Sequence, residues 1–153
     1  MRSDTTDRAL GLRPAWIGAL ALLGVPRVVA HDLDLVGPVV NAVLVFLPLA
    51  AWLGVVLWRR VPNPFLTLAA VGLAYGVLLA VTHQVLWAES FGGEPPSLGG
   101  NLAGALSPGA EGFVLRIFAF FSSLLTGLGV GAATGVVGWV LARLVPGFRP
   151  PRR

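Results

Sequence analysis

Four long apolar stretches, separated by short polar segments, make up most of this chain of 153 residues. They cover residues 14–30, 39–58, 65–87 and 113–144. A helix needs roughly 17 to 25 mainly apolar residues to cross the hydrocarbon core of a bilayer, and each stretch reaches that length. Lipid cannot pair with backbone polar groups, so the stretches are expected to be helical. The sequence predicts an all-α integral membrane protein, an antiparallel four-helix transmembrane bundle in which residues 1–153 form a single membrane domain.

The charged side chains between the stretches sort by sign. The arginines that flank one predicted side of the membrane are Arg2, Arg8, Arg13, Arg59, Arg60, Arg143, Arg149, Arg152 and Arg153. The carboxylates that flank the other side are Asp32, Asp34, Glu89, Glu94 and Glu111. Lys and Arg in short loops are retained in the cytoplasm during insertion. Residues 1–13 and 145–153 are therefore predicted to be a cytoplasmic leader and a basic cytoplasmic tail, and residues 88–112 an extracytoplasmic loop.

Composition supports a membrane protein and argues against several other classes. The chain is 12% charged and 56% hydrophobic, whereas soluble domains are about a quarter charged and just under half apolar. The net charge of +4 comes from arginines beside the spans, so we expect contact with the lipid bilayer and no nucleic-acid partner. The chain has no cysteine, which excludes disulfides and thiolate metal sites. Small size and the lack of organelle-targeting signals favour a bacterial plasma membrane.

The first stretch has a second interpretation, as a cleavable signal peptide. A basic leader and an apolar run over residues 15–25 precede a group of small residues before His31, which is the pattern of such a peptide. Cleavage would leave three spans in the same orientation. Pro26 and Arg27 fit a signal peptide poorly, so a retained span is favoured. Proline interrupts helical hydrogen bonding, so bends are expected at Pro26 and, in the second span, at Pro48.

Small residues recur at intervals of three or four on the third and fourth stretches. They are Ala69, Gly72, Gly76 and Ala80 on the third, and Ser123, Gly127, Gly131 and Gly135 on the fourth. In lipid, small residues at this spacing allow helix backbones to approach closely. We expect the two series to face each other as helix-packing surfaces. The alternatives are that they join two copies of the chain, or that glycine is simply common in membrane helices.

Five polar side chains within the spans share one predicted depth, about one helical turn below the outer surface. They are Arg27, Asn41, His83, Gln84 and Arg116, with His31, Asp32, Asp34, Glu89 and Glu111 placed to cap them from the loops. Ionisable groups in a span are costly and usually pair or face the bundle interior. The five are therefore the candidate ligand-binding residues, for an anionic group or lipid headgroup. The alternative is that they only satisfy one another, with Arg116 paired to Glu111 or Glu89.

Cofactor and catalytic motifs are weak. His31 and His83 are the candidate metal or haem ligands, but their spacing matches no ligand motif, so no cofactor is expected. The chain contains no phosphate loop and no GxSxG elbow, the motifs that would indicate nucleotide or hydrolase chemistry. We therefore expect that the protein is not an enzyme and has no catalytic residues.

The sequence indicates a small polytopic membrane protein without assigning its activity. The favoured hypothesis is a non-enzymatic scaffold or accessory subunit, which packs through its Gly-rich helix faces against a second copy or another membrane protein. The alternative is a binding or transport protein with an outward-facing polar pocket. An open cavity lined by Arg116 and His83 would favour binding, and tight packing with direct salt bridges would favour the scaffold.

Overall fold

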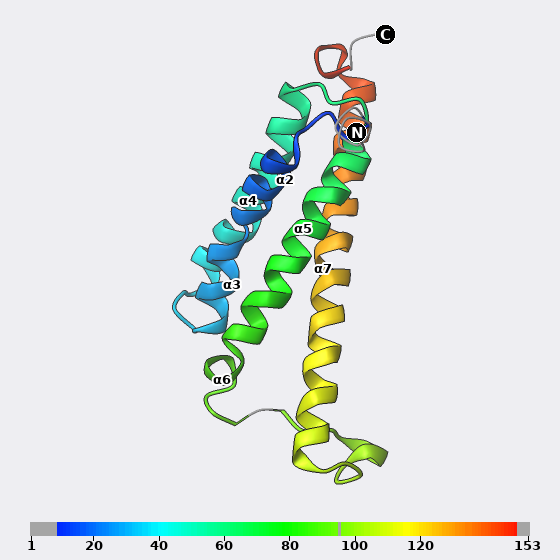
Figure 1. The fold of residues 1–153 in the computed structure, drawn as a ribbon. Helices are drawn as coiled ribbons and strands as arrows, with labels where there is room; N and C mark the ends of the chain where they lie inside the picture. Colours follow the sequence, from blue (N-terminus) through cyan, green and yellow to red (C-terminus); the bar gives the residue numbers. More distant parts are fainter. Residues whose placement is uncertain (1–8, 95, 150–153) are drawn as a thin grey trace.

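The computed structural model describes residues 9–94 and 96–149, and its elements are helical (Figure 1). Four segments are long and apolar enough to cross a membrane: Pro14–Asp32, Pro38–Trp58, Pro64–Val85 and Pro108–Leu144. No strand occurs within these described ranges. The predicted all-α fold with four candidate spans is therefore confirmed. Four arginines of the predicted leader and tail lie outside the described residues, namely Arg2, Arg8, Arg152 and Arg153.

The first span is two helices rather than one bent helix. α2 (Pro14–Leu22) and α3 (Val25–Asp32) are separated by a turn that ends at Gly24. The break therefore precedes Pro26, which lies in the first turn of α3, where its missing N–H needs no helical partner. A Cβ on Gly24 would lie 2.5 Å from the ring of Tyr75, so glycine also allows this turn to approach the third span.

The second span, α4 (Pro38–Trp58), carries Pro48 near its middle. Proline has no N–H, so the carbonyl of Leu44 loses its partner in the helix. One turn further on, the indole of Trp52 donates a buried hydrogen bond of 2.6 Å to the carbonyl of Leu20 in α2. This bond joins the first two spans.

The third and fourth spans, α5 (Pro64–Val85) and α7 (Pro108–Leu144), lie side by side along most of α5 (Figure 1). The side chain of Asn63 caps α5 by accepting a hydrogen bond of 3.1 Å from the N–H of Leu66. α7 begins five residues before the predicted boundary at 113 and has 37 residues. At about 1.5 Å per residue it is roughly 55 Å long, well beyond the ~30 Å hydrocarbon core. It must therefore tilt or extend beyond the core.

The predicted loop over residues 88–112 contains local structure. It begins within α6 (Trp87–Ser90) and includes a short 3-10 helix, η1 (Gly100–Leu102). The carboxylate of Glu111, in the first turn of α7, accepts a hydrogen bond from the N–H of Leu98. This bond attaches the loop to the start of α7. The loop lies at the same end of the bundle as the α3–α4 connection, and both termini lie at the opposite end (Figure 1).

The buried core lies toward the end of the bundle that holds the termini. Its fully buried side chains include Trp52, Val56, Leu68 and Val71. The hydroxyl of Thr67 on α5 donates to the carbonyl of Leu10 at 2.6 Å, which fixes the N-terminal segment to the bundle. After α7 the chain forms a second 3-10 helix, η2 (Pro146–Phe148).

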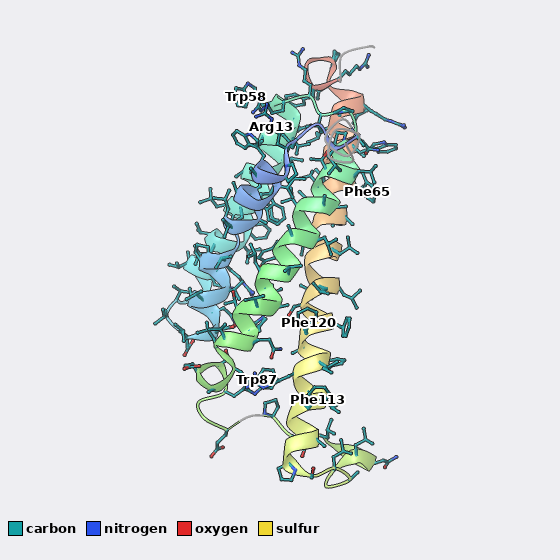
Figure 2. The ribbon with its side chains drawn as sticks, viewed as in Figure 1. Arg13, Trp58, Phe65, Trp87, Phe113 and Phe120 are labelled. Carbon is teal, nitrogen blue, oxygen red and sulfur yellow. The ribbon has the colours of Figure 1, made fainter. Side chains whose placement is uncertain are left out.

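The outward faces of the helices are apolar. Val39 on α4 is 78% exposed, and Phe118 on α7 is 71% exposed. Figure 2 shows Arg13 and Trp58 at the end that holds the termini, with Trp87 toward the other end. Tryptophan favours membrane interfaces and exposed apolar side chains favour lipid. These surfaces therefore suit a bilayer.

Candidate ligand-binding site

Small residues bring α5 and α7 into close contact. Gly72 and Gly76 lie against Gly127 and Gly131, and a Cβ on Gly131 would lie only 2.6 Å from the Cα of Gly72. The other buried members of the two series are Ala80, Ser123 and Gly135, and Ala69 is half-buried. These glycine faces are therefore covered within the chain, and they are not free to contact another copy.

A cavity of about 510 Å³ lies between the ends of α3 and α5 and the first half of α7, beneath α6 and the loop. We call it the loop-end cavity. Its polar lining residues are His31, Asp32, His83, Ser90, Ser122 and Ser123. Its apolar lining includes Trp87, Phe91 and Phe118. Apolar walls with a few convergent polar groups are typical of small-molecule sites.

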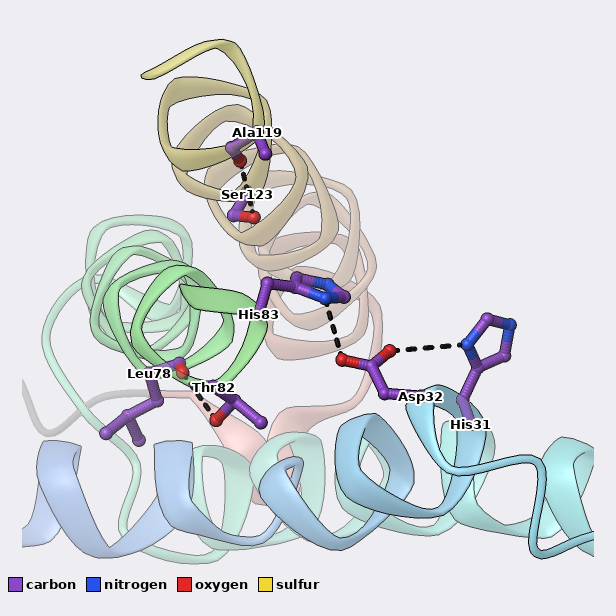
Figure 3. A network of polar contacts seen from close by, with 7 residues as sticks. All are labelled: His31, Asp32, Leu78, Thr82, His83, Ala119 and Ser123. Carbon is purple, nitrogen blue, oxygen red and sulfur yellow. Dashed lines mark hydrogen bonds and ion pairs between the residues drawn. The ribbon is translucent and has the colours of Figure 1, made fainter. Parts of the chain in front are cut away.

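His83 and Asp32 form the polar wall of the loop-end cavity. Nδ1 of His83 lies 2.8 Å from Oδ2 of Asp32, whose side chain is only 4% exposed (Figure 3). Nδ1 of His31 lies 3.5 Å from the other carboxylate oxygen. The contact through Nδ1 fixes the ring of His83 and leaves Nε2 on the far side of the ring. Asp32 thus acts as the positioning residue for His83.

One buried hydroxyl of the lining, Oγ of Ser90, lacks a hydrogen-bond partner among the described residues. Oδ2 of Asp32 is also buried, but it is held by the contact with Nδ1 of His83 at 2.8 Å. Buried polar atoms are nearly always paired, so each exception calls for a partner such as water, an ion or a ligand. Both residues line the loop-end cavity. A ligand with a hydroxyl group would supply the missing partner of Ser90 and could also donate to the Asp32 carboxylate.

Arg116 lies beside the loop-end cavity and does not line it. Its Nη1 donates to Oε1 of Gln84 at 3.1 Å, and Nε2 of Gln84 donates to the carbonyl of Arg116 at 3.0 Å. The guanidinium also lies 4.8 Å from the ring centre of Trp87. The expected ion pair with Glu111 or Glu89 is not among the contacts of the described residues. An amide and an aromatic face hold Arg116 instead, by hydrogen bonds and a cation–π contact.

Arg27 and Asn41 do not reach the loop-end cavity either. Arg27 lines a second cavity of about 220 Å³, which we call the mid-bundle cavity. Oδ1 of Asn41 is buried on α4 without a hydrogen-bond partner in the described part of the chain. The five residues predicted to form one polar layer are thus divided. His83 lines one cavity, Arg27 lines the other, Gln84 and Arg116 bind each other, and Asn41 lines neither.

Three polar residues of the loop-end cavity, Asp32, Ser90 and Ser122, are not among the candidate ligand-binding residues predicted from the sequence. Asp32 was expected in a loop, but it is the last residue of α3, two residues beyond the predicted span end. Ser90 was not identified, because no sequence signal marks the short helix α6. Ser122 is outside the two small-residue series, yet it lines the cavity. A partial signal existed, since Ser122 lies next to the small-residue series that brings α7 against α5.

The two candidate metal ligands, His31 and His83, both contact the carboxylate of Asp32. Among residues 9–94 and 96–149, no group of three or more His, Asp or Glu side chains is arranged to hold a metal ion. In this structure the imidazoles of His31 and His83 therefore contact the carboxylate of Asp32.

No protein-family model, curated protein or solved structure matches this chain. What the protein binds has to be inferred from its own side chains. The described lining of the loop-end cavity carries one carboxylate, two imidazoles and three hydroxyls, without an arginine. The charges and hydrogen-bonding groups of this lining indicate which kind of ligand the cavity can hold.

Proposed function

We propose that this small polytopic membrane protein is a binding protein whose loop-end cavity holds an amphiphile with an uncharged, hydroxyl-bearing head. We further propose that it is not an enzyme. The observation that carries the proposal is the lining of one cavity, which holds both the Asp32–His83 ion pair and the buried hydroxyl of Ser90, a group without a hydrogen-bond partner among the described residues. Leaving a buried polar group unpaired costs about 1–3 kcal/mol. A ligand hydroxyl that pairs with Ser90 would recover that energy.

The charges around the cavity favour an uncharged head over the anionic group expected from the sequence. An anionic head would lie close to the Asp32 carboxylate, while Arg27 and Arg116 lie outside the lining. Like charges at short range in a partly buried site repel strongly. A hydroxyl group can donate to Oδ2 of Asp32, and a second one can exchange a hydrogen bond with Nε2 of His83.

The apolar part of the lining suits an acyl chain. Leu115, Phe118 and Ala119 line the cavity from α7, and Phe118 belongs to the outward face of that helix, at 71% exposure. A chain attached to the head can therefore follow α7 into the hydrocarbon core. The proposed ligand thus has its head beside His83 and its tail in lipid.

We propose a plasma-membrane location, in a bacterium, with both termini cytoplasmic and the loop-end cavity on the extracytoplasmic side. Arg59 lies 5.0 Å from the ring centre of Trp16, and Arg143 lies 3.7 Å from that of Trp139. All four residues belong to the end of the bundle that holds the termini. Arginine favours the cytoplasmic side and tryptophan the interface, so these pairs support the assignment.

A scaffold or accessory subunit is the second candidate function. The observation in its favour is a shallow apolar groove on α4, lined by Val39, Val43 and Phe46 among others, which a helix of another copy or of another membrane protein would fit. Lipid chains fit such a groove equally well. The glycine faces that first suggested a scaffold are covered by the contact of α5 with α7, so we place this candidate second.

The proposal is tested by thermal unfolding of the purified protein in a non-ionic detergent. The two probes are 1-monooleoylglycerol, with a neutral diol head, and oleoyl lysophosphatidic acid, with the same chain and an anionic head. At 100 times its Kd a ligand stabilises the folded state by about 2.7 kcal/mol. We expect monooleoylglycerol to raise the unfolding midpoint by several degrees and the anionic lipid to raise it far less.

The variant His83→Ala should lose the effect of monooleoylglycerol. Thr82→Val is the matched control, because the Thr82 hydroxyl bonds the carbonyl of Leu78 at 2.8 Å and the residue does not line the cavity. An equal shift in wild type and His83→Ala, or a larger shift with the anionic lipid, would refute the proposal. Mass spectrometry of the recovered monooleoylglycerol should show it intact, and a hydrolysis product would contradict the non-enzymatic role.

A further inference from the structure

The mid-bundle cavity is independent of the loop-end cavity and is lined by residues of all four spans. Its volume is about 220 Å³. The lining residues that matter here are Arg27 from the first span, Leu44 and Trp52 from the second, Tyr75 from the third and Thr126 from the fourth. A cavity lined by residues of every span forms only in the folded bundle. It is therefore a property of the whole fold and not of one helix surface.

Arg27 provides the only charged group in the described lining of this cavity. Its Nε is buried without a hydrogen-bond partner in the described part of the chain, and no carboxylate of the described residues forms an ion pair with it. The nearby carboxylate on α3, Asp32, is taken by His83 and His31. An arginine inside a span usually pairs with an opposite charge. An anionic ligand would supply the opposite charge that Arg27 lacks among the described residues.

Further polar groups accompany Arg27. Tyr75 lies beside its guanidinium, and Thr126 adds a hydroxyl from α7. Pro48 leaves the carbonyl of Leu44 without its helical partner, and both residues line the cavity. The indole of Trp52, by contrast, is already bonded to the carbonyl of Leu20, so its ring serves as an apolar wall. One cation, two hydroxyls and apolar walls form a site for one anionic group on an apolar body.

The volume of the mid-bundle cavity limits the size of the ligand. An engineered apolar protein cavity of about 150 Å³ holds benzene. The mid-bundle cavity, at about 220 Å³, adds the space of about two water molecules, at about 30 Å³ each. We propose that the mid-bundle cavity binds a small organic carboxylate of about the size of benzoate, with its oxygens on Arg27 and its apolar body against Trp52 and Tyr75.

The mid-bundle cavity lies one helical turn deeper in the bundle than the loop-end cavity. On α5, Leu79 of the mid-bundle cavity is one turn from His83 of the loop-end cavity, and on α7 Thr126 is one turn from Ser122. The two cavities therefore follow one another along the same sides of both helices. The proposal does not require the loop-end cavity to bind an amphiphile.

Binding is measured by isothermal titration calorimetry on the full-length protein in a non-ionic detergent. The probes are benzoate, benzamide as its uncharged counterpart of the same shape, and acetate as a carboxylate without a ring. A hydrogen bond to a charged group contributes enough for a tenfold or larger effect on affinity. We expect benzoate to bind with a stoichiometry of one and at least tenfold more tightly than either benzamide or acetate.

The variant Arg27→Gln should bind benzoate no better than benzamide. Arg116→Gln is the matched control, because Arg116 is the other arginine well inside a span and does not line the cavity. If Arg27→Gln does not fold, Val130→Phe is the second test of the site. This variant retains Arg27 but fills the cavity with a larger side chain, so it should abolish benzoate binding. Equal affinities for benzoate and benzamide, no binding of benzoate, or acetate as tight as benzoate would each overturn the proposal.

Discussion

A close backbone contact between α5 and α7 gives the sharpest test of the fold, through Gly131→Ala. A Cβ on Gly131 would lie 2.5 Å from the carbonyl oxygen of Leu68 and 2.6 Å from the Cα of Gly72. Comfortable contacts between carbon atoms are about 3.5–4.0 Å, so the helices would have to separate by about 1 Å. A gap of that size removes a quarter to a half of the dispersion energy of the atoms affected.

Gly129→Ala is the matched control, because a Cβ on Gly129 meets nothing within 4 Å. Both changes gain the same helix propensity, up to about 1 kcal/mol. The difference between the two variants therefore isolates the steric term. Overpacking of a well-packed contact costs about 1–3 kcal/mol. We expect Gly131→Ala to be less stable than Gly129→Ala by that amount.

The assay is reversible unfolding in mixed micelles, with increasing mole fraction of sodium dodecyl sulfate and tryptophan fluorescence as the signal. Gly131→Leu should lower stability further than Gly131→Ala, because its side chain is larger and the neighbouring atoms are backbone. Equal midpoints for Gly131→Ala and Gly129→Ala would show that α5 and α7 do not pack through this glycine. The contact of the two small-residue series would then have to be abandoned.

Two further predictions concern the joint between the first two spans and the topology. Trp52→Phe should lower stability by about 1–3 kcal/mol in the same unfolding assay, because the carbonyl of Leu20 loses a buried donor. Trp58→Phe is the control, because Trp58 is 77% exposed, and it should have little effect. Equal losses of stability in the two variants would contradict the role of the Trp52–Leu20 hydrogen bond. The chain has no cysteine, so Ser97→Cys and Gly147→Cys can be labelled one at a time with an impermeant maleimide in intact cells. Only Ser97→Cys should react, and labelling of both or only of Gly147→Cys would refute the topology.

Hydropathy was sufficient for the spans, but local backbone chemistry set their ends. α7 starts at Pro108, in a Ser-Pro-Gly-Ala segment that reads as loop by composition. Proline at the first position is preorganised for a helix and needs no N–H partner there. Pro108 therefore indicates the start of α7 better than the polarity of the segment does. The break in the first span at Gly24 instead of Pro26 has the same origin, since Pro26 lies in the first turn of α3, which begins at Val25.

The depth of the polar residues could be estimated from the alternation of the spans, but their direction around each helix could not. His83 and Gln84 are neighbours in sequence, and successive residues of an α-helix point about 100° apart. They therefore point toward different neighbours. In the structure His83 reaches Asp32 while Gln84 reaches Arg116. The rotation of α5 about its own axis determines which residue faces which neighbour. That rotation is set by the packing of α5 against α7, which depends on contacts between distant parts of the chain.

The position of the loop-end cavity follows from where the small-residue series end. Through Ala80 on α5 and Ser123 on α7, each turn at the interface carries a small buried side chain, and the backbones remain close. One turn beyond Ala80 the position is occupied by Gln84, which bonds Arg116 across the interface. Two long side chains need more room than two glycines, so the helices separate there and leave space beside them for a ligand. The same helix pair thus supplies both the tight packing that stabilises the bundle and the opening that we propose as its binding site.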